Sequence, residues 1–132
     1  MKRRKKYTVL VLVKHSEAHF SQSPSEEMKT QGEINAFINS WSPEIIQTGG
    51  YHCCGLSDYD WFGTFETDEI SYWEAFREDY HRRFHGRGIR RTEIIGVNHE
   101  EFVRATDRIE HYRTMRAQGV FPGMAETGES DG

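Results

Sequence analysis

Two segments of the chain are apolar on both sides of an extended backbone. Residues 7–14 place three valines on one side and two leucines on the other, and residues 60–66 place large apolar groups on both sides in the same way. A strand that is apolar on both sides is buried on both sides, as the central strands of a covered sheet are. The pattern therefore predicts that these two segments form the middle of a sheet.

Two other extended segments carry more polar positions. Residues 45–55 contain the pair Gly49-Gly50, which predicts a bulge or bend, and they form a hairpin with residues 60–66. Residues 89–97 form the last strand, which is more polar at its start. We expect these two segments at the edges of the sheet.

Two helices connect the strands, and each shows an apolar stripe. The first begins at residues 23–26, where Ser-Pro-Ser-Glu gives a capping box with proline in the first turn. The second opens at Thr67-Asp68 and ends at Gly86 and Gly88. The stripes consist of Ile34, Phe37, Ile38 and Trp41 in the first helix, and of Trp73, Phe76, Tyr80 and Phe84 in the second.

The order of elements is β-α-β-β-α-β, the ferredoxin-like α+β arrangement, which predicts an antiparallel sheet with strand order 4-1-3-2. Both crossover helices then cover one side of the sheet and leave apolar groups bare on the other. A second copy of the chain, in a closed two-fold homodimer through the open sheet face, is the simplest cover. The alternative cover is an extra C-terminal helix, running from Asn98 to about Arg116, whose inward residues are expected to be Phe102, Ala105, Ile109 and Tyr112.

The length of 132 residues fits one domain with one core. We expect a basic disordered tail at 1–6 and the ferredoxin-like domain at 7–97. A helix packed on the domain or on a partner follows at 98–117, and an acidic, glycine-rich tail at 118–132 is expected to be disordered.

Composition argues against several classes of partner. The formal net charge of -4 argues against nucleic acid. The basic run at 2–6 precedes an apolar segment, as in a signal peptide, but that segment leads to Lys14 and His15 without a cleavage site. No apolar segment is long enough to cross a membrane. Cys53 and Cys54 are adjacent and point to opposite sides of a strand, so they do not easily bridge. These features predict a cytoplasmic protein.

Short motifs occur along residues 7–97: Tyr7-Thr8-Val9 with Val11 and Val13-Lys14, Ser23-Pro24-Ser25-Glu26-Glu27, Ser57-Asp58 with Trp61, Phe65-Glu66-Thr67 before a helix with Tyr72, and Glu93-Ile94-Ile95. With the order of elements, they resemble the dimeric α+β barrel superfamily and, within it, the darcynin family. The basic N-terminus, the histidine-rich helix end and the third helix differ from that family. The resemblance implies a dimer with a cleft between sheet and helices. The superfamily includes cofactor-free monooxygenases, isomerases, polyketide cyclases and haem enzymes, so the resemblance implies no single reaction.

Four residues are candidates for proton chemistry in such a cleft. His52, His81 and Asp60 are the candidate proton-handling groups, and Tyr51 could stabilise an oxyanion. Asp60 is expected beside apolar rings, where a carboxyl group favours its neutral form and can act as a base. The aromatic residues Trp61, Phe65, Trp73, Phe76 and Tyr80 are expected mainly in the core, and some of them could line the site of a flat apolar ligand.

Other histidines allow alternatives. His81 and His85 have the i, i+4 spacing that puts two imidazoles on one side of a helix, which suits a metal or an axial haem ligand, but cations at a helix C-terminus have the same pattern. His15 and His19 lie after the first strand, either at a pocket mouth or in a solvated linker.

The first hypothesis is a small-molecule enzyme or ligand-binding protein that acts on an apolar or aromatic compound as an isomerase, cyclase or monooxygenase, with no cofactor and no metal. The second is a haem protein in the style of chlorite dismutases, with His81 or His85 as axial ligand. The third is a non-enzymatic interaction module. The sequence does not decide whether the chain is an enzyme.

Overall fold

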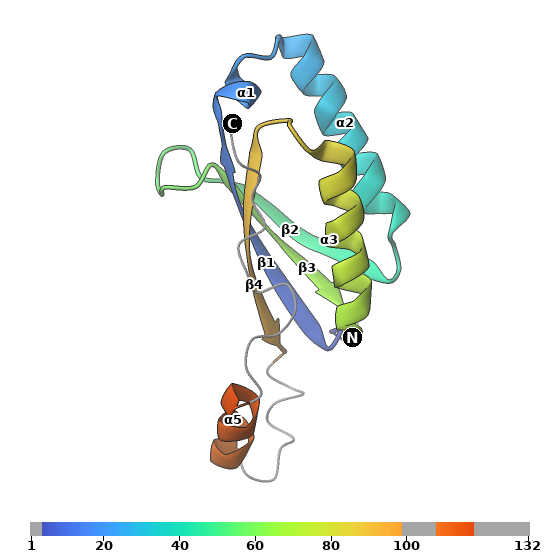
Figure 1. Cartoon of the computed structure of the whole chain (residues 1–132), viewed down its shortest axis with the longest axis vertical. Helices are drawn as coiled ribbons and strands as arrows, with labels where there is room; N and C mark the ends of the chain where they lie inside the picture. Colours follow the sequence, from blue (N-terminus) through green and yellow to red (C-terminus); the bar gives the residue numbers. More distant parts are fainter. Residues whose placement is uncertain (1–3, 99–107, 118–132) are drawn as a thin grey trace.

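The computed structural model describes residues 4–98 and 108–117. A four-stranded antiparallel sheet carries helices α2 and α3 on one side (Figure 1). The strand order is β2-β3-β1-β4, which is the predicted order 4-1-3-2 read from the other edge. The elements are β1 (Tyr7–His15), α1 (Glu17–Phe20), α2 (Pro24–Ser40), β2 (Ile45–His52), β3 (Trp61–Thr67), α3 (Ile70–Phe84), β4 (Ile89–Val97) and α5 (Arg108–Ala117). The ferredoxin-like α+β fold is therefore confirmed.

The central strands are the two that the apolar pattern predicts. β1 pairs antiparallel with β3 on one side and β4 on the other, so that Val11 lies opposite Gly63 and opposite Glu93. The three valines of β1 are buried toward the helices, and the leucines between them are half-buried on the other face. The core between sheet and helices consists of Val9, Val11, Val13, Phe37, Ile38, Ile45, Phe65, Trp73, Phe76, Phe84, Ile89 and Ile95.

A β-bulge interrupts β2 where the glycine pair predicts one. The pairing of β2 with β3 shifts register between Gln47 and Gly49. Because side chains alternate along a strand, one inserted residue exchanges the faces of everything that follows it. His52 therefore faces the helices, whereas Tyr51 lies on the open face and stacks on Phe62 with ring centroids 4.9 Å apart.

The helix boundaries follow local chemistry. The Ser23 side chain accepts a hydrogen bond from the Glu26 N–H, and the Glu26 carboxylate accepts one from the Ser23 N–H, which confirms the capping box of α2. Helix α3 begins slightly later than predicted, because Thr67 ends β3 and its hydroxyl accepts a hydrogen bond from the Glu69 N–H. Gly86, just beyond the end of α3, has a positive φ of 80°.

Two short helices flank this core. The expected linker after β1 contains the single turn α1, which is tied to the α3–β4 turn by a hydrogen bond from the Ser16 N–H to the Gly88 carbonyl. Helix α5 corresponds to the C-terminal part of the third helix that the sequence predicted, and it lies beyond the end of β4 (Figure 1). Ile109 and Tyr112 are exposed and do not point inward as predicted, and Phe102 and Ala105 lie outside the described residues.

The expected basic tail is partly fixed. The Lys5 N–H donates to the Glu66 carboxylate at 2.9 Å, and the Lys6 N–H donates to the Asp68 carboxylate at 3.0 Å. Residues 1–3 and 118–132 lie outside the described residues, so the predicted disorder there stays a prediction. Within the described residues, no helix has the length and apolar character needed to span a membrane.

Candidate functional site

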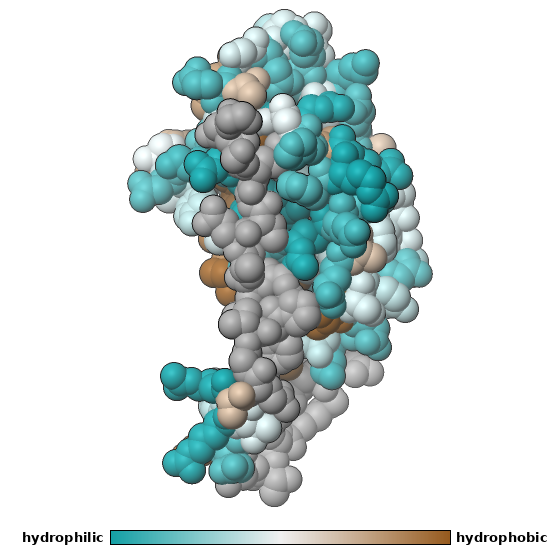
Figure 2. Space-filling model, viewed as in Figure 1, coloured by the Kyte–Doolittle hydropathy of each residue, from teal (hydrophilic) through white to brown (hydrophobic). Residues whose placement is uncertain are grey.

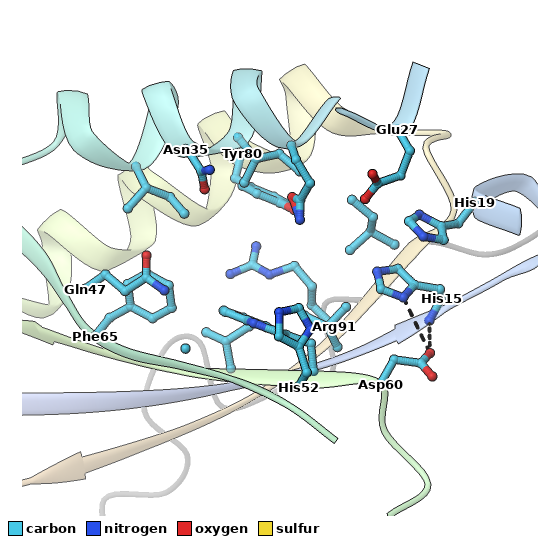
Figure 3. A pocket seen from close by; sticks show the side chains of 18 of the residues that line it. His15, His19, Glu27, Asn35, Gln47, His52, Asp60, Phe65, Tyr80 and Arg91 are labelled. Carbon is cyan, nitrogen blue, oxygen red and sulfur yellow. Dashed lines mark hydrogen bonds and ion pairs between the residues drawn. The ribbon is translucent and has the colours of Figure 1, made fainter. Parts of the chain in front are cut away.

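A cavity of about 540 Å³ lies between the helix-facing side of the sheet and helix α2, at the end of β1 (Figure 3). This volume suits a small organic ligand. The lining residues are Val11, Val13, His15, His19, Glu27, Gln31, Ile34, Asn35, Ile38, Gln47, Gly50, His52, Asp60, Trp61, Phe65, Phe76, Tyr80, Ile89 and Arg91. They come from all four strands and from α1, α2 and α3, and thus from most of the chain.

One half of this lining is apolar. Two valines of β1 and two isoleucines of α2 lie there with the rings of Trp61, Phe65, Phe76 and Tyr80. Gly63 lies under this lining, because a Cβ at that position would collide with the Trp61 ring. A glycine there leaves the indole room to lie flat along the sheet. Flat aromatic walls of this kind suit a flat apolar or aromatic compound.

The polar groups at the mouth centre on His15 and Asp60. The Asp60 carboxylate accepts a hydrogen bond from the His15 backbone N–H at 2.8 Å, and the same oxygen lies 3.6 Å from His15 Nδ1. The Asp60 backbone is fixed on both sides, because its N–H donates to the Val13 carbonyl and its carbonyl accepts from the Cys53 N–H. We assign the His15 proton to Nδ1, facing the carboxylate, which leaves Nε2 free to accept a proton.

A second histidine lies on the first. The rings of His15 and His19 are stacked with centroids 3.8 Å apart, because the single turn α1 brings residue 19 back over the end of β1. Burial lowers the pKa of His15 below its usual range, and the neighbouring His19 lowers it further. The carboxylates of Asp60 and Glu27 oppose this shift, and His52 adds slightly to it. The net effect keeps His15 neutral at neutral pH, which is the form a general base needs.

Arg91 supplies a positive charge inside the cavity. Its side chain is on the helix-facing side of β4, only 6% of the residue is exposed, and its guanidinium lies 4.3 Å from the centre of the Tyr80 ring. An arginine remains charged in proteins, so this cavity contains a buried cation. In Figure 3 the Arg91 side chain lies between the helices and the sheet, away from the cluster of Glu27, His19, His15 and Asp60.

The structure brings together six of the predicted site residues and separates the rest. His52, Asp60, Trp61, Phe65, Phe76 and Tyr80 line the cavity. Trp73 lies in the core, where its indole N–H donates to the Glu93 carboxylate. Tyr51 is on the opposite face of the sheet. His81 on α3 and His85 just beyond the end of α3 are exposed and are not among the lining residues.

The surroundings of the Asp60 side chain also differ from those that the sequence predicted. Its side chain is 43% exposed and pairs with His15, so it is not enclosed by apolar rings. It therefore orients the neighbouring imidazole of His15. Of the two alternatives for His15 and His19, the pocket mouth is the one observed.

Sequence reasoning missed Arg91. Alternate residues of β4 face the helices, and that row reads Ile89, Arg91, Glu93, Ile95. Two opposite charges inside a row that is otherwise apolar are the signal that could have revealed a buried polar group. Within the described residues, no group of three or more His, Cys, Asp or Glu side chains is placed to hold a metal ion.

Comparison with known proteins shows a likeness in structure only. No family model matches the chain, and no curated protein matches it in sequence. The similar solved structures include chlorite dismutase from Candidatus Nitrospira defluvii in complex with imidazole, with TM-score 0.65, 15% identity, and coverage of 86% of this chain and 49% of that one. The R173A mutant of that enzyme matches with TM-score 0.64, 16% identity, and coverage of 86% and 48%.

The W146Y R173Q mutant matches with TM-score 0.64, 17% identity, and coverage of 74% and 41%. The chain thus spans about half the length of these chlorite dismutase chains. At such identity the likeness shows the fold alone, which agrees with the ferredoxin-like α+β arrangement described above.

Proposed function

We propose that the chain is a small-molecule enzyme of the dimeric α+β barrel type, which moves a proton on an apolar or aromatic compound held in the cavity. One observation carries the proposal: a neutral His15, oriented by Asp60, stands at the mouth of an aromatic-walled cavity. The reaction class that fits is isomerisation of a carbon acid without a cofactor.

The proton transfer follows from this arrangement. His15 Nε2 takes a proton from a carbon next to a carbonyl group, and the electron pair of the broken C–H bond moves into the carbonyl to form an enolate. The Asp60 carboxylate stabilises the imidazolium that results. In a substrate whose enolate is conjugated with a C=C bond, the proton returns to the far carbon of that dienolate, the double bond shifts, and the carbonyl re-forms. This completes the isomerisation and restores neutral His15. His52 faces the same cavity and is near enough to influence the charge of His15, so it is a second candidate for moving that proton.

Hydrogen exchange at carbon tests this proposal. The probe is 2-tetralone, a neutral aromatic ketone with acidic C–H groups, incubated with the protein in D₂O and followed by NMR. We expect exchange above the buffer rate and a loss of about 100- to 10,000-fold in His15→Gln, the range for removing a general base. The exposed His81→Gln is the matched control and should exchange like the wild type. Exchange that is equal in His15→Gln and the wild type would reject His15 as the base.

A second candidate function is haem binding, which the likeness to the chlorite dismutase fold favours. His81 and His85 do not fit as axial ligands inside the cavity, because they are exposed at the C-terminal end of α3 and do not line the cavity. His52 fits better, because it faces the cavity from β2. When bound, haem would supply redox chemistry at its iron. A Soret band on haem titration that is lost in His52→Ala, but kept in His81→Ala and His85→Ala, would support this function.

We further propose that two copies pair through the open sheet face, as in the dimeric α+β barrel superfamily. That face carries Leu10, Leu12, Phe62 and the exposed Ile94. Figure 2 shows hydrophobic surface at the left edge of the molecule, on the sheet side, whereas the surface of the helices is mostly hydrophilic. The third hypothesis, an interaction module without a ligand, predicts no polar cavity, so the cavity counts against it.

The darcynin family and a cytoplasmic location are narrower proposals. The darcynin proposal depends on the short sequence motifs along residues 7–97. Cys53 and Cys54 are both free, which is the state that a reducing compartment favours.

A further inference from the structure

We infer that His19 is a positioning residue for the base His15, held in its ring stack by a directed hydrogen-bond network that begins at Arg87. The inference rests on the proposed function for the role of His15 as a base, whereas the stack and the network are features of the fold. It assigns a part in the reaction to Gln22, Thr30 and Arg87, which lie behind the cavity lining.

The first argument is the geometry of the histidine pair. The rings of His15 and His19 are nearly parallel, with an interplanar angle of 14° and centroids 3.8 Å apart, so His19 covers one face of the His15 imidazole. The Asp60 carboxylate holds an edge of the same imidazole, 3.6 Å from Nδ1. Contacts on a face and on an edge together restrict the rotation of the ring, which keeps Nε2 in one orientation.

The second argument is the set of hydrogen bonds behind His19. The Gln22 carboxamide donates to the His19 carbonyl at 3.2 Å, and the same amide nitrogen lies 3.5 Å from His19 Nδ1. The Thr30 hydroxyl, on the buried side of α2, donates to the Gln22 carboxamide oxygen at 3.4 Å. Arg87, in the turn after α3, donates to the Thr30 hydroxyl oxygen at 3.2 Å and pairs with Glu33 at 3.4 Å. The network therefore joins α1 to α2 and to the α3–β4 turn.

This network has a single direction. An arginine can only donate, so the Thr30 oxygen accepts from Arg87 and the Thr30 proton is available for the Gln22 oxygen. That contact turns the amide nitrogen of Gln22 toward His19, where Nδ1 accepts. One amide group thus contacts both the carbonyl and the ring of His19, which fixes the ring relative to its own backbone and holds it over His15.

The third argument is the electrostatic effect of the stacked ring. The titratable and charged side chains that line the cavity with His15 come from α1, α2, β2, β4 and the residue before β3: His19, Glu27, His52, Asp60 and Arg91. Burial lowers the pKa of His15 most, and the largest effect of a neighbouring side chain comes from His19, which also lowers it. His19 thus both orients the base and favours its neutral form.

Titration of the histidine rings by NMR tests the inference without any substrate. The imidazole C–H signals of the full chain are followed between about pH 5 and 8, where histidines change charge. The His15 signal is assigned by its absence in His15→Gln. We expect the pKa of His15 to be higher in His19→Phe than in the wild type, because a phenyl ring keeps the stack but carries no competing charge.

Thr30→Val breaks the network behind the cavity lining and removes no charge. Valine has the shape of threonine without its hydroxyl, so Gln22 loses its fixed orientation and His19 loses its support. We expect the pKa of His15 to rise here too, and the nuclear Overhauser contact between the two rings to weaken. Arg87→Met should act in the same direction, whereas Arg87→Lys should restore most of the wild-type behaviour, because lysine still donates. The Arg87 pair makes the same test if Thr30→Val does not fold.

Exchange of 2-tetralone separates orientation from charge. At a pH where His15 is neutral in every variant, Thr30→Val should exchange about 10- to 100-fold more slowly than the wild type, the loss that a misplaced catalytic group causes. His19→Phe should keep most of the wild-type rate there, and the midpoint of its pH profile should rise with the pKa of His15. Thr8→Val is the matched control, because it removes a half-buried hydroxyl that donates to Asn98 at the far end of β1. It should match the wild type in both measurements.

The outcomes separate this inference from the proposed function. Identical His15 titration curves in the wild type, His19→Phe and Thr30→Val would overturn the inference, even where His15-dependent exchange occurs. A Thr8→Val variant that changes His15 as much as Thr30→Val does would also overturn it, because the effect would then reflect a general loss of stability. Ring titrations that respond as expected, without any His15-dependent exchange in the wild type, would support the control of His15 by His19 and reject the proposed reaction.

Discussion

At the scale of single residues, the chemistry of the site depends on how the ends of strands are fixed. His15 is the last residue of β1, and its backbone N–H donates to the Asp60 carboxylate. The carboxylate therefore serves as both a backbone partner and an imidazole partner, so the base is oriented by the same contact that joins the end of β1 to the start of β3.

Burial of His15 makes folding stability depend on pH. Its pKa is lowered in the folded chain, first by burial and then by His19, so the unfolded chain binds a proton more readily. The contribution of His15 to stability is fully present above its ordinary pKa of 6.5, and is lost as the pH falls below that value toward the lowered one. We expect His15→Gln to flatten the change in unfolding free energy between about pH 5 and 7.

Urea denaturation at a series of pH values measures this effect. The exposed His81→Gln is the control, and its pH profile should follow that of the wild type. A His15→Gln profile as steep as the wild type would mean that other groups cause the acid sensitivity.

Residue-level reasoning recovered the aromatic part of the site but not its charged part. Trp61, Phe65, Phe76 and Tyr80 were predictable because large rings at strand and helix spacings face a common core. Arg91 was not, because its burial depends on Tyr80, which is distant in the sequence and meets it only after the sheet forms. Tyr51 and His52 were both assigned to one site, although neighbouring residues of a strand point to opposite faces. The bulge before them decides that His52 is the one that faces the cavity. A glycine pair predicts that a bulge exists, but not which residue is doubled.

At the scale of elements, the turn between α3 and β4 holds the mouth of the cavity. Gly88 has a φ of 76°, and its carbonyl accepts a hydrogen bond from the Ser16 N–H at the start of α1. A Cβ at Gly88 would lie 2.8 Å from Ser16 Oγ and 3.1 Å from the Ala18 carbonyl carbon, and it would also meet the His19 backbone nitrogen. The glycine thus lets α1 pack close enough to stack His19 on His15.

Two glycines in this turn allow a controlled comparison. Gly86 has a φ of 80° but open space where a Cβ would be, so Gly86→Ala bears only the backbone cost of about 1–2 kcal/mol. Gly88→Ala bears that cost and a steric clash, so we expect a loss of about 3–4 kcal/mol in unfolding free energy. Chemical denaturation measures both variants. Equal losses would show that α1 does not pack tightly on the turn.

At the scale of the whole molecule, the described helices and strands cover one side of the sheet and leave its other side open. Helices α2 and α3 cover the side that holds the cavity, and β1 and β3 place apolar side chains on the opposite side as well. The chain spans about half the length of the chlorite dismutase chains that share its fold. A second copy would both cover the open face and bring the assembly to a comparable size.

A single charge on the open face tests this arrangement. Ile94 lies on that face of β4 and is 52% exposed, so Ile94→Lys disturbs the isolated chain little. In a two-fold dimer each substitution occurs twice, and a lysine buried in an apolar interface is unpaired. We expect the wild type to be dimeric at micromolar concentration by light scattering, and Ile94→Lys to weaken the dimer by at least about 30-fold, as loss of a central interface residue does.

Met28→Lys makes a similar change on α2, where the side chain is 72% exposed, and should leave the dimer intact. A monomeric wild type, or a dimer that Met28→Lys disrupts and Ile94→Lys does not, would place the partner elsewhere.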